Sequence, residues 1–116
     1  MVEDQTKLDG AFHALAHPAR RDMLRRLAKS ELTVGELAAP VDMSLAAASK
    51  HIQVLERAGL VRRTVAGRRH VCRLDPAPIA SAFEWLRFYE RYWNERLDDL
   101  QALVENEQPD DEEKRR

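Results

Sequence analysis

Residues 44–61, SLAAASKHIQVLERAGLV, place side chains that could read the edges of DNA bases on one predicted helix. Ser44 can cap its first turn, and Ala48, Ile52 and Leu55 repeat at helical spacing as a narrow apolar stripe. The other side of the helix is small or polar. Glutamine can pair with adenine, lysine with guanine, and an alanine methyl can contact thymine. We therefore expect base contacts from Ser44, Ala47, Ser49, Lys50 and Gln53.

A second group of polar and basic side chains flanks this helix. Such residues bind phosphates and fix the register of a protein on DNA without reading sequence. The expected backbone contacts are Thr33, His51, Arg57, Arg68 and Arg69. Both Thr33 and Ser44 are also predicted helix caps, and capping is compatible with DNA contact.

The preceding residues predict the helices that would position this one. A first helix is expected over residues 4–16, and Pro18 starts a second, residues 18–30, whose arginines we expect outside. Thr33 and Glu36 fit a capping box at the start of a short third helix. Residues 41–43 form the turn into the Ser44 helix, and Gly59 suits the position after its end. The pattern predicts a helix-turn-helix.

Two short strand patterns, residues 61–65 and 69–74, flank Ala66-Gly67-Arg68 and predict a β-hairpin. Its arginines favour a wing that follows a phosphate track or enters a minor groove. The alternative is an edge hairpin that charge protects from aggregation. The wing is favoured because the hairpin directly follows the helix-turn-helix.

A long last helix is expected over residues 79–105, and it carries all but one of the aromatic residues. Leu86, Trp93 and Leu100 repeat every seven residues, as in a coiled coil. Because the first half is apolar nearly all round, we expect a second copy of the chain to cover it; burial inside its own domain is the alternative. The predicted dimer interface comprises Phe12, Phe83, Leu86, Tyr89, Trp93, Leu97 and Leu100. A charged tail, residues 106–116, is predicted to be disordered.

The bulk composition fits one small domain. The 116 residues carry a net charge of −1, but residues 18–73 carry +7 and the two ends are acidic, which suits a protein that binds a polyanion with its centre. No run of about 18 apolar residues predicts a membrane span. The acidic start is unlike a secretory signal, so we expect a cytoplasmic protein. The predicted fold is mainly α with a small β-hairpin, in about five helices, with residues 1–105 as one winged helix-turn-helix domain.

Four segments, ALAHPARRDMLRRL, LTVGELA, SLAAASKHIQVLERAGLV and GRRHVCRLDP, resemble the ArsR family of winged-helix transcriptional repressors over roughly residues 10–76. The resemblance implies a homodimer on a pseudo-palindromic operator, with the last helix as the dimerising element. Metal-sensing members carry paired cysteines in a Glu-Leu-Cys-x-Cys-x-Leu motif, where this chain has Thr33 and Gly35. A second family site uses histidine on the terminal helix, and no histidine follows His70. We expect no metal and no cofactor.

Other reactive side chains predict no further chemistry. Cys72 is expected to point inward as a small apolar residue, and His13 and His17 are too few for a closed metal site. No nucleophile–base set or phosphate loop suggests an enzyme. The predicted function is sequence-specific DNA binding by a homodimeric repressor. The alternative is a dimeric winged helix whose arginines bind an acidic protein.

Overall fold

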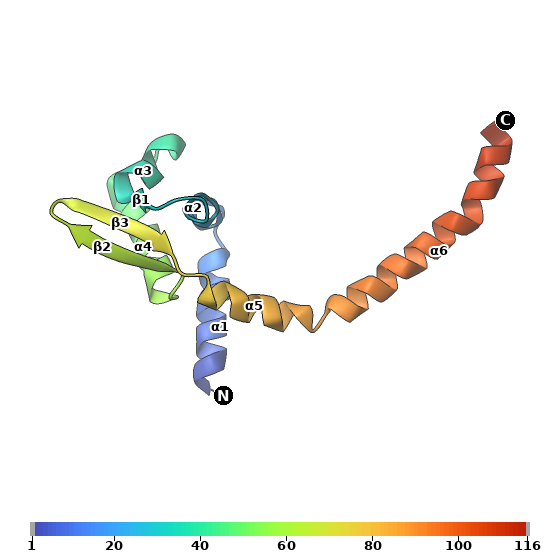
Figure 1. Ribbon diagram of the computed structural model, residues 1–116, viewed down its shortest axis with the longest axis horizontal. Coiled ribbons are helices and arrows are strands. Elements are labelled where there is room, and N and C mark those ends of the chain that lie inside the picture. Colours follow the sequence, from blue (N-terminus) through green and yellow to red (C-terminus); the bar gives the residue numbers. More distant parts are fainter. Residues whose placement is uncertain (1, 116) are drawn as a thin grey trace. The chain divides into compact units, whose positions relative to one another are not determined.

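Residues 2–115, the part of the chain whose backbone is described, fold into six α-helices, one 3-10 turn and a three-stranded antiparallel sheet (Figure 1). The computed structural model describes the backbone of residues 2–115 and the side chains of residues 5–106. The elements, in chain order, are α1 (Val2–Leu15), α2 (Pro18–Leu27), β1 (Leu32–Thr33), α3 (Val34–Ala38), η1 (Ala39–Val41), α4 (Leu45–Arg57), β2 (Val61–Ala66), β3 (Arg69–Leu74), α5 (Ala77–Arg87) and α6 (Glu90–Arg115).

Local side-chain chemistry sets most helix boundaries where the sequence predicts them. The capping box of α3 is confirmed: Thr33 Oγ1 accepts from the Glu36 N–H, and the Glu36 carboxylate accepts from the Thr33 N–H. Ser44 caps α4 by accepting from the Ala47 N–H. Pro18 begins α2 after His17, which caps it. Gly59 adopts a φ of 76°, a conformation that costs glycine little, so the chain can turn sharply from α4 into β2.

The sheet has the order β1-β3-β2. β2 and β3 form the predicted hairpin, but its connection is shorter than expected, because Ala66 pairs with Arg69 and leaves a two-residue loop. Gly67 takes the positive φ of 63° that such a loop requires. β1 was not predicted; its two residues pair with Val71 and Cys72 and join the segment before α3 to the hairpin.

The core lies between α2, α3, α4 and the inner face of the hairpin. Ile52 and Leu55 of α4 are fully buried, as are Leu37 of α3 and Cys72 of β3. Val34 and Met43 pack against this cluster from its edge and join the helix-turn-helix to the core. The stripe that buries α4 also fixes which of its faces points outward.

The C-terminal part differs from the prediction of one helix over residues 79–105. The helix divides into α5 and α6, with a break at Phe88 and Tyr89. There the N–H groups of Phe88 and Tyr89 donate to carbonyls three residues back, and this tighter turn interrupts the α-helical ladder. Leu86 and Trp93 consequently stand on different helices, so the expected seven-residue repeat is not continuous.

Compact units comprise residues 1–82 and 83–116. The backbone of α6 stays helical to Arg115, where the sequence predicts a disordered tail over residues 106–116. The side chains of residues 107–116 lie outside the described part. Among the described residues, no helix combines the length and apolarity needed to cross a membrane.

Candidate nucleic-acid interface

α3 and α4 form a helix-turn-helix whose second helix presents a polar outer face. η1 and the turn residue Asp42, whose φ of 50° is left-handed, connect the two helices. Asp42 is suited to this position because aspartate tolerates left-handed backbone better than most residues do. The turn leaves the N-terminus of α4, capped by Ser44, open to solvent.

Lys50, Gln53 and Arg57 are exposed and lie on one face of α4, opposite the buried Ala48, Ile52 and Leu55. Ala47 and Ser49 are half-buried at the sides of this face, and Ser44 is exposed at its start. The fold therefore brings the five residues expected to contact bases to one helix. Its outer face presents a lysine ammonium and a glutamine amide, the groups that pair with base edges in a major groove.

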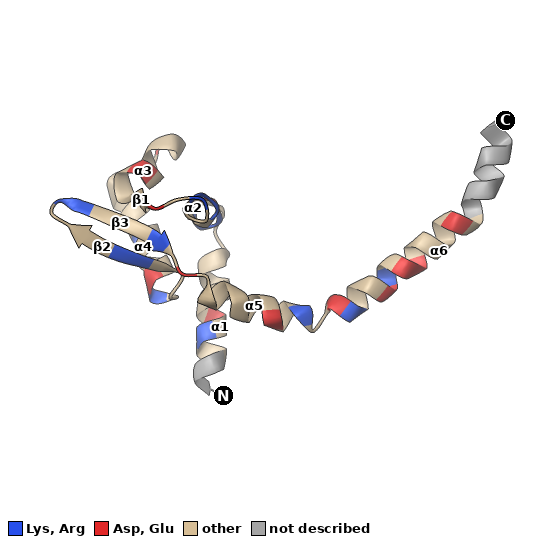
Figure 2. Ribbon diagram, viewed as in Figure 1, with Lys and Arg blue, Asp and Glu red and all other residues tan. Residues whose placement is uncertain are grey.

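The hairpin places two arginines at its tip (Figure 2). Arg68 and Arg69 are exposed, and within residues 5–106 neither forms a salt bridge. Arg62 and Arg73, nearer the base, are paired with Asp75 and Glu31 at 3.0 and 3.8 Å. The Ala77 N–H donates to the Asp75 carboxylate, and this bond, followed by that from Arg62, holds the pKa of the carboxyl below its usual value. The tip is thus the part of the hairpin best placed to bind phosphate.

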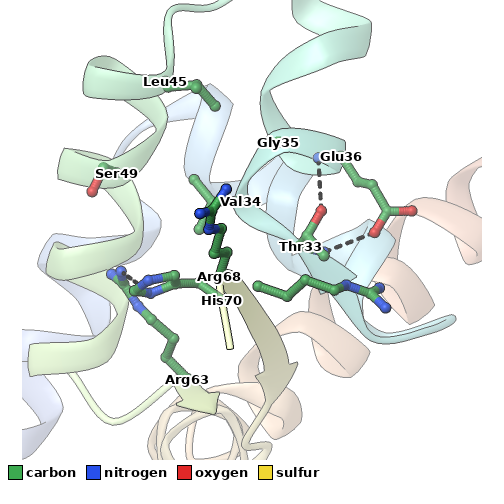
Figure 3. A pocket seen from close by; sticks show the side chains of 10 residues that line it. Thr33, Val34, Gly35, Glu36, Leu45, Ser49, Arg63, Arg68 and His70 are labelled. Atoms are coloured by element: carbon green, nitrogen blue, oxygen red, sulfur yellow. Dashed lines mark hydrogen bonds between the residues drawn. The ribbon is translucent and has the colours of Figure 1, made fainter. Parts of the chain in front are cut away.

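A groove of about 620 Å³ separates the hairpin from α3 and α4 (Figure 3). It has a cationic side and a side formed by the capping box of α3. The bonds from Thr33 that cap the helix lower the pKa of Glu36, with smaller contributions from Arg69 and Arg26. The lining residues are Thr33, Val34, Gly35, Glu36, Leu45, Ser49, Arg63, Arg68, Arg69 and His70. The groove lies beside the exposed face of α4, so it belongs to the same candidate interface.

A polar chain attaches the hairpin to α4. Arg63 of β2 donates to the carboxylate of Glu56 on α4 at 2.5 Å, and its other terminal nitrogen lies 3.4 Å from Nδ1 of His70 on β3. The side chains of Arg63 and Glu56 are only 17% and 32% exposed, and the Arg63 Nε is buried. Because a buried charge without a partner is costly, this pair fixes the hairpin relative to the helix.

His51 lies on the flank of α4 that faces α1 and α2, away from Lys50 and Gln53. Its Nδ1 is 3.3 Å from the guanidinium of Arg20, and its ring centroid is 4.4 Å from that of His17. Burial, followed by the charges of His17 and Arg20, lowers the pKa of His51. An arginine only donates, so the contact requires a neutral His51 with its proton on Nε2.

The side chains considered for thiol or metal chemistry are either buried or not grouped together. Cys72 is fully buried, as predicted, and burial raises the pKa of its thiol despite the opposing effect of Arg63. A thiol of this kind is a poor nucleophile. Across residues 5–106, histidine, cysteine, aspartate and glutamate nowhere gather in a group of three that could hold a metal ion.

The residues expected at the dimer interface occupy three helices. Phe12 is half-buried on α1. Within residues 83–106 the aromatic and aliphatic side chains of α5 and α6 are largely uncovered, with Trp93 62%, Leu97 56% and Leu100 58% exposed. Phe83, Leu86 and Tyr89 are likewise exposed.

Two arginines of the site were missed by the sequence interpretation. Arg20 was expected on the outer face of α2 but is 9% exposed, and Arg63 was counted only as a wing charge. A signal for Arg20 exists: it precedes Met23, Leu24 and Leu27 by three, four and seven residues, which places it on the apolar face. For Arg63, no periodicity predicts the partner.

The comparisons with known proteins agree with this geometry. Residues 15–64 match a family model described as a helix-turn-helix domain. Over 102 residues the chain is 39% identical to the HTH-type transcriptional regulator Rv2034 of Mycobacterium tuberculosis, covering 88% of this chain and 92% of that protein. A crystal structure of an ArsR family transcriptional regulator superposes with a TM-score of 0.72 at 39% identity, covering 78% and 93% of the two chains. A homodimeric winged helix-turn-helix DNA-binding domain from Mycobacterium bovis, Mb0332, is 28% identical with a TM-score of 0.61, covering 75% and 81%.

The Glu56–Arg63 pair predicts a specific stability difference. Glu56→Ala should lower the free energy of unfolding by about 2 kcal/mol, since a hydrogen bond to a charged group is lost and the guanidinium stays buried. Glu31→Ala, which removes an exposed partner of Arg73, should change it by less than about 0.5 kcal/mol. Urea unfolding of both variants measures this. Equal losses would show that the buried pair adds nothing beyond a surface contact.

The lowered pKa of His51 predicts a pH dependence of stability. As the pH falls, His51 takes up a proton near pH 6.5 in the unfolded chain but only at lower pH in the folded protein. Stability is therefore complete above about pH 6.5 and declines as the pH falls toward the folded pKa. In thermal unfolding from pH 8 to 5, His51→Asn and His51→Phe should both show a shallower decline than the wild type. An unchanged decline in both variants would assign the pH dependence to other groups.

Proposed function

Because this chain belongs to the ArsR family of winged helix-turn-helix transcriptional regulators, we propose that it is a homodimeric repressor that acts by occupying a pseudo-palindromic operator. The proposal includes no enzymatic activity. It assigns base reading to Ser44, Ala47, Ser49, Lys50 and Gln53, and backbone binding to Thr33, Arg57, Arg68 and Arg69.

The outer face of α4 is the observation that carries this proposal. It combines an amide and an ammonium group, at Gln53 and Lys50, with Arg57 one turn further on and little other charge. A helix of 13 residues is about 20 Å long and fits the major groove of B-DNA. The arginine tip of the hairpin would then bind the adjacent backbone or minor groove.

Two features support a homodimer. The exposed apolar side chains of α5 and α6 form an uncovered surface, which marks an interaction site in most proteins. The similar domain from Mycobacterium bovis is described as homodimeric. A two-fold dimer would present its two α4 helices to successive major grooves about 34 Å apart.

Repression follows from occupancy in this proposal. The bound dimer covers the operator and excludes polymerase, and a signal that changes the angle between the protomers releases it. The setting is the cytoplasm, where the DNA of a bacterial target lies. The alternative, a winged helix that uses its arginines to bind an acidic protein, shares the charge distribution but makes no use of Gln53.

Genome-wide capture of bound DNA, followed by footprinting of the strongest site, tests the proposal. A protected two-fold symmetric site is expected. On that duplex, log K should fall with log salt at a slope of about −0.9 per phosphate neutralised. Recovery of no preferred sequence, together with salt-sensitive binding to an acidic polypeptide, would favour the alternative.

Residues that read bases and residues that bind phosphate should respond differently to substitution. Lys50→Ala and Gln53→Ala should each weaken binding to the operator by about 1–3 kcal/mol per protomer and change binding to random duplex far less. Arg69→Ala should weaken both alike and reduce the salt slope by about one for each copy. Fluorescence anisotropy on the two duplexes measures this. Equal loss on both would reassign Lys50 or Gln53 to the DNA backbone.

Introducing one charged side chain tests the proposed dimer surface. Leu97→Glu should produce a monomer and abolish tight operator binding, since a carboxylate would enter an apolar interface. Asp99→Ala, two residues after Leu97 and therefore on the opposite face of α6, should leave the dimer intact. Sedimentation equilibrium measures mass in each case. A dimeric Leu97→Glu protein that binds its operator normally would exclude Leu97 from the interface.

A further inference from the structure

Arg20 lies on α2 and forms hydrogen bonds to residues of two other helices, α1 and α4. Its Nε donates to the carbonyl of Ala14 at 2.6 Å, and a terminal nitrogen donates to the carbonyl of His13 at 3.0 Å. Both carbonyls belong to the last turn of α1, where backbone acceptors lack the usual partner four residues on, and the His13 carbonyl also accepts from the Ala16 N–H at 3.2 Å. A cation there also interacts favourably with the helix dipole.

The third contact of Arg20 is with α4, the helix proposed to read DNA bases. Its other terminal nitrogen approaches Nδ1 of His51 at 3.3 Å, and His51 in turn lies against the ring of His17. His17 is held in place because its Nδ1 accepts from the Ala19 N–H. A planar guanidinium with fixed donor directions therefore joins the end of α1 to the middle of α4.

We propose that Arg20 is a positioning residue that sets the orientation of α4 relative to α1, the helix that carries the predicted dimer-interface residue Phe12, through its simultaneous bonds to the last turn of α1 and to His51. The link is rigid because Arg20 is only 9% exposed and each of its guanidinium nitrogens has a partner. His51 acts as the acceptor of this link, a role distinct from the phosphate contact that the sequence suggests.

Arg21 provides a natural comparison. It also binds the end of α1, by donating to the Leu15 carbonyl at 2.7 Å, but it is exposed and has no contact with α4 among the described residues. If capping of α1 were the whole role of these arginines, the two would be equivalent. The proposal predicts that they differ in what they do to DNA binding.

The inference rests on the proposed function, because its readout is the geometry of a dimer on two half-sites. One extra base pair between half-sites rotates one of them by about 35° and moves it by about 3.4 Å. A dimer with firmly held α4 helices discriminates strongly against that change. A dimer in which α4 can tilt relative to α1 accepts both spacings more equally.

The test measures the affinity of the full-length protein for the footprinted operator and for the same duplex with one base pair inserted at its centre. Arg20→Lys keeps the charge but loses the guanidinium fork. It should reduce the ratio of the two affinities by about tenfold relative to the wild type, within the range by which network residues change coupling. Arg21→Lys should leave the ratio unchanged.

His51 gives an independent arm of the same experiment. His51→Phe removes the acceptor and should reduce the spacing ratio as Arg20→Lys does. His51→Asn places a carbonyl oxygen near the position of Nδ1 and should restore it. In the double variant of Arg20→Lys and His51→Phe, the spacing ratio should fall no further than in either single variant. The same link between Arg20 and His51 is broken in all three proteins.

Several outcomes would overturn the inference. Unchanged spacing ratios in Arg20→Lys and His51→Phe would reduce Arg20 to a cap of α1, as would equal effects of Arg20→Lys and Arg21→Lys. Equal weakening on both duplexes with a smaller salt slope in the His51 variants would return His51 to phosphate binding. Absence of a two-fold operator for the wild-type protein would be a failure of the proposed function, and it is recognised before any variant is measured.

Discussion

The N-terminal part of the fold depends on arginine side chains that donate to backbone carbonyls at helix ends. Arg20 and Arg21 bind the carbonyls at the end of α1, and Arg26 donates to those of Glu36 and Leu37 in the last turn of α3. All three arginines come from α2. Because a buried backbone acceptor without a partner is costly, the buried bond from Arg20 to the Ala14 carbonyl ties α1 to α2, and the more exposed bonds of Arg21 and Arg26 add further links from α2 to α1 and α3.

Helix α4 has three sides with three different uses. Ile52 and Leu55 face the core, Lys50 and Gln53 face solvent, and His51 meets Arg20 on the flank. The core contacts and the contact with Arg20 therefore hold α4 in place, and the polar side chains of its outer face stay exposed to solvent. The hairpin follows the same principle, because the pair of Arg63 and Glu56 anchors it and leaves Arg68 and Arg69 exposed at the tip.

Local rules predicted the parts of the candidate interface that depend on neighbours in sequence. The caps at Thr33 and Ser44, the turn at Gly59 and the inward Cys72 each follow from spacing within a few residues. The break at Phe88 was missed, since an apolar periodicity continues through a tightened turn as readily as through an α-helix. The strand β1 was missed because two residues carry too little pattern to predict pairing.

The sequence by itself determined the helix-turn-helix, the hairpin and the outer face of α4, because caps, turns and apolar periodicity act over short distances and need no partner elsewhere. Only the tertiary structure decided which arginines are free to meet DNA. Arginine side chains are long and flexible, so their type and position in the chain do not reveal whether they bind carbonyls, a carboxylate or solvent. Arg20 and Arg63 found partners 31 and 7 residues away, and those contacts exist only once the helices and the hairpin have packed.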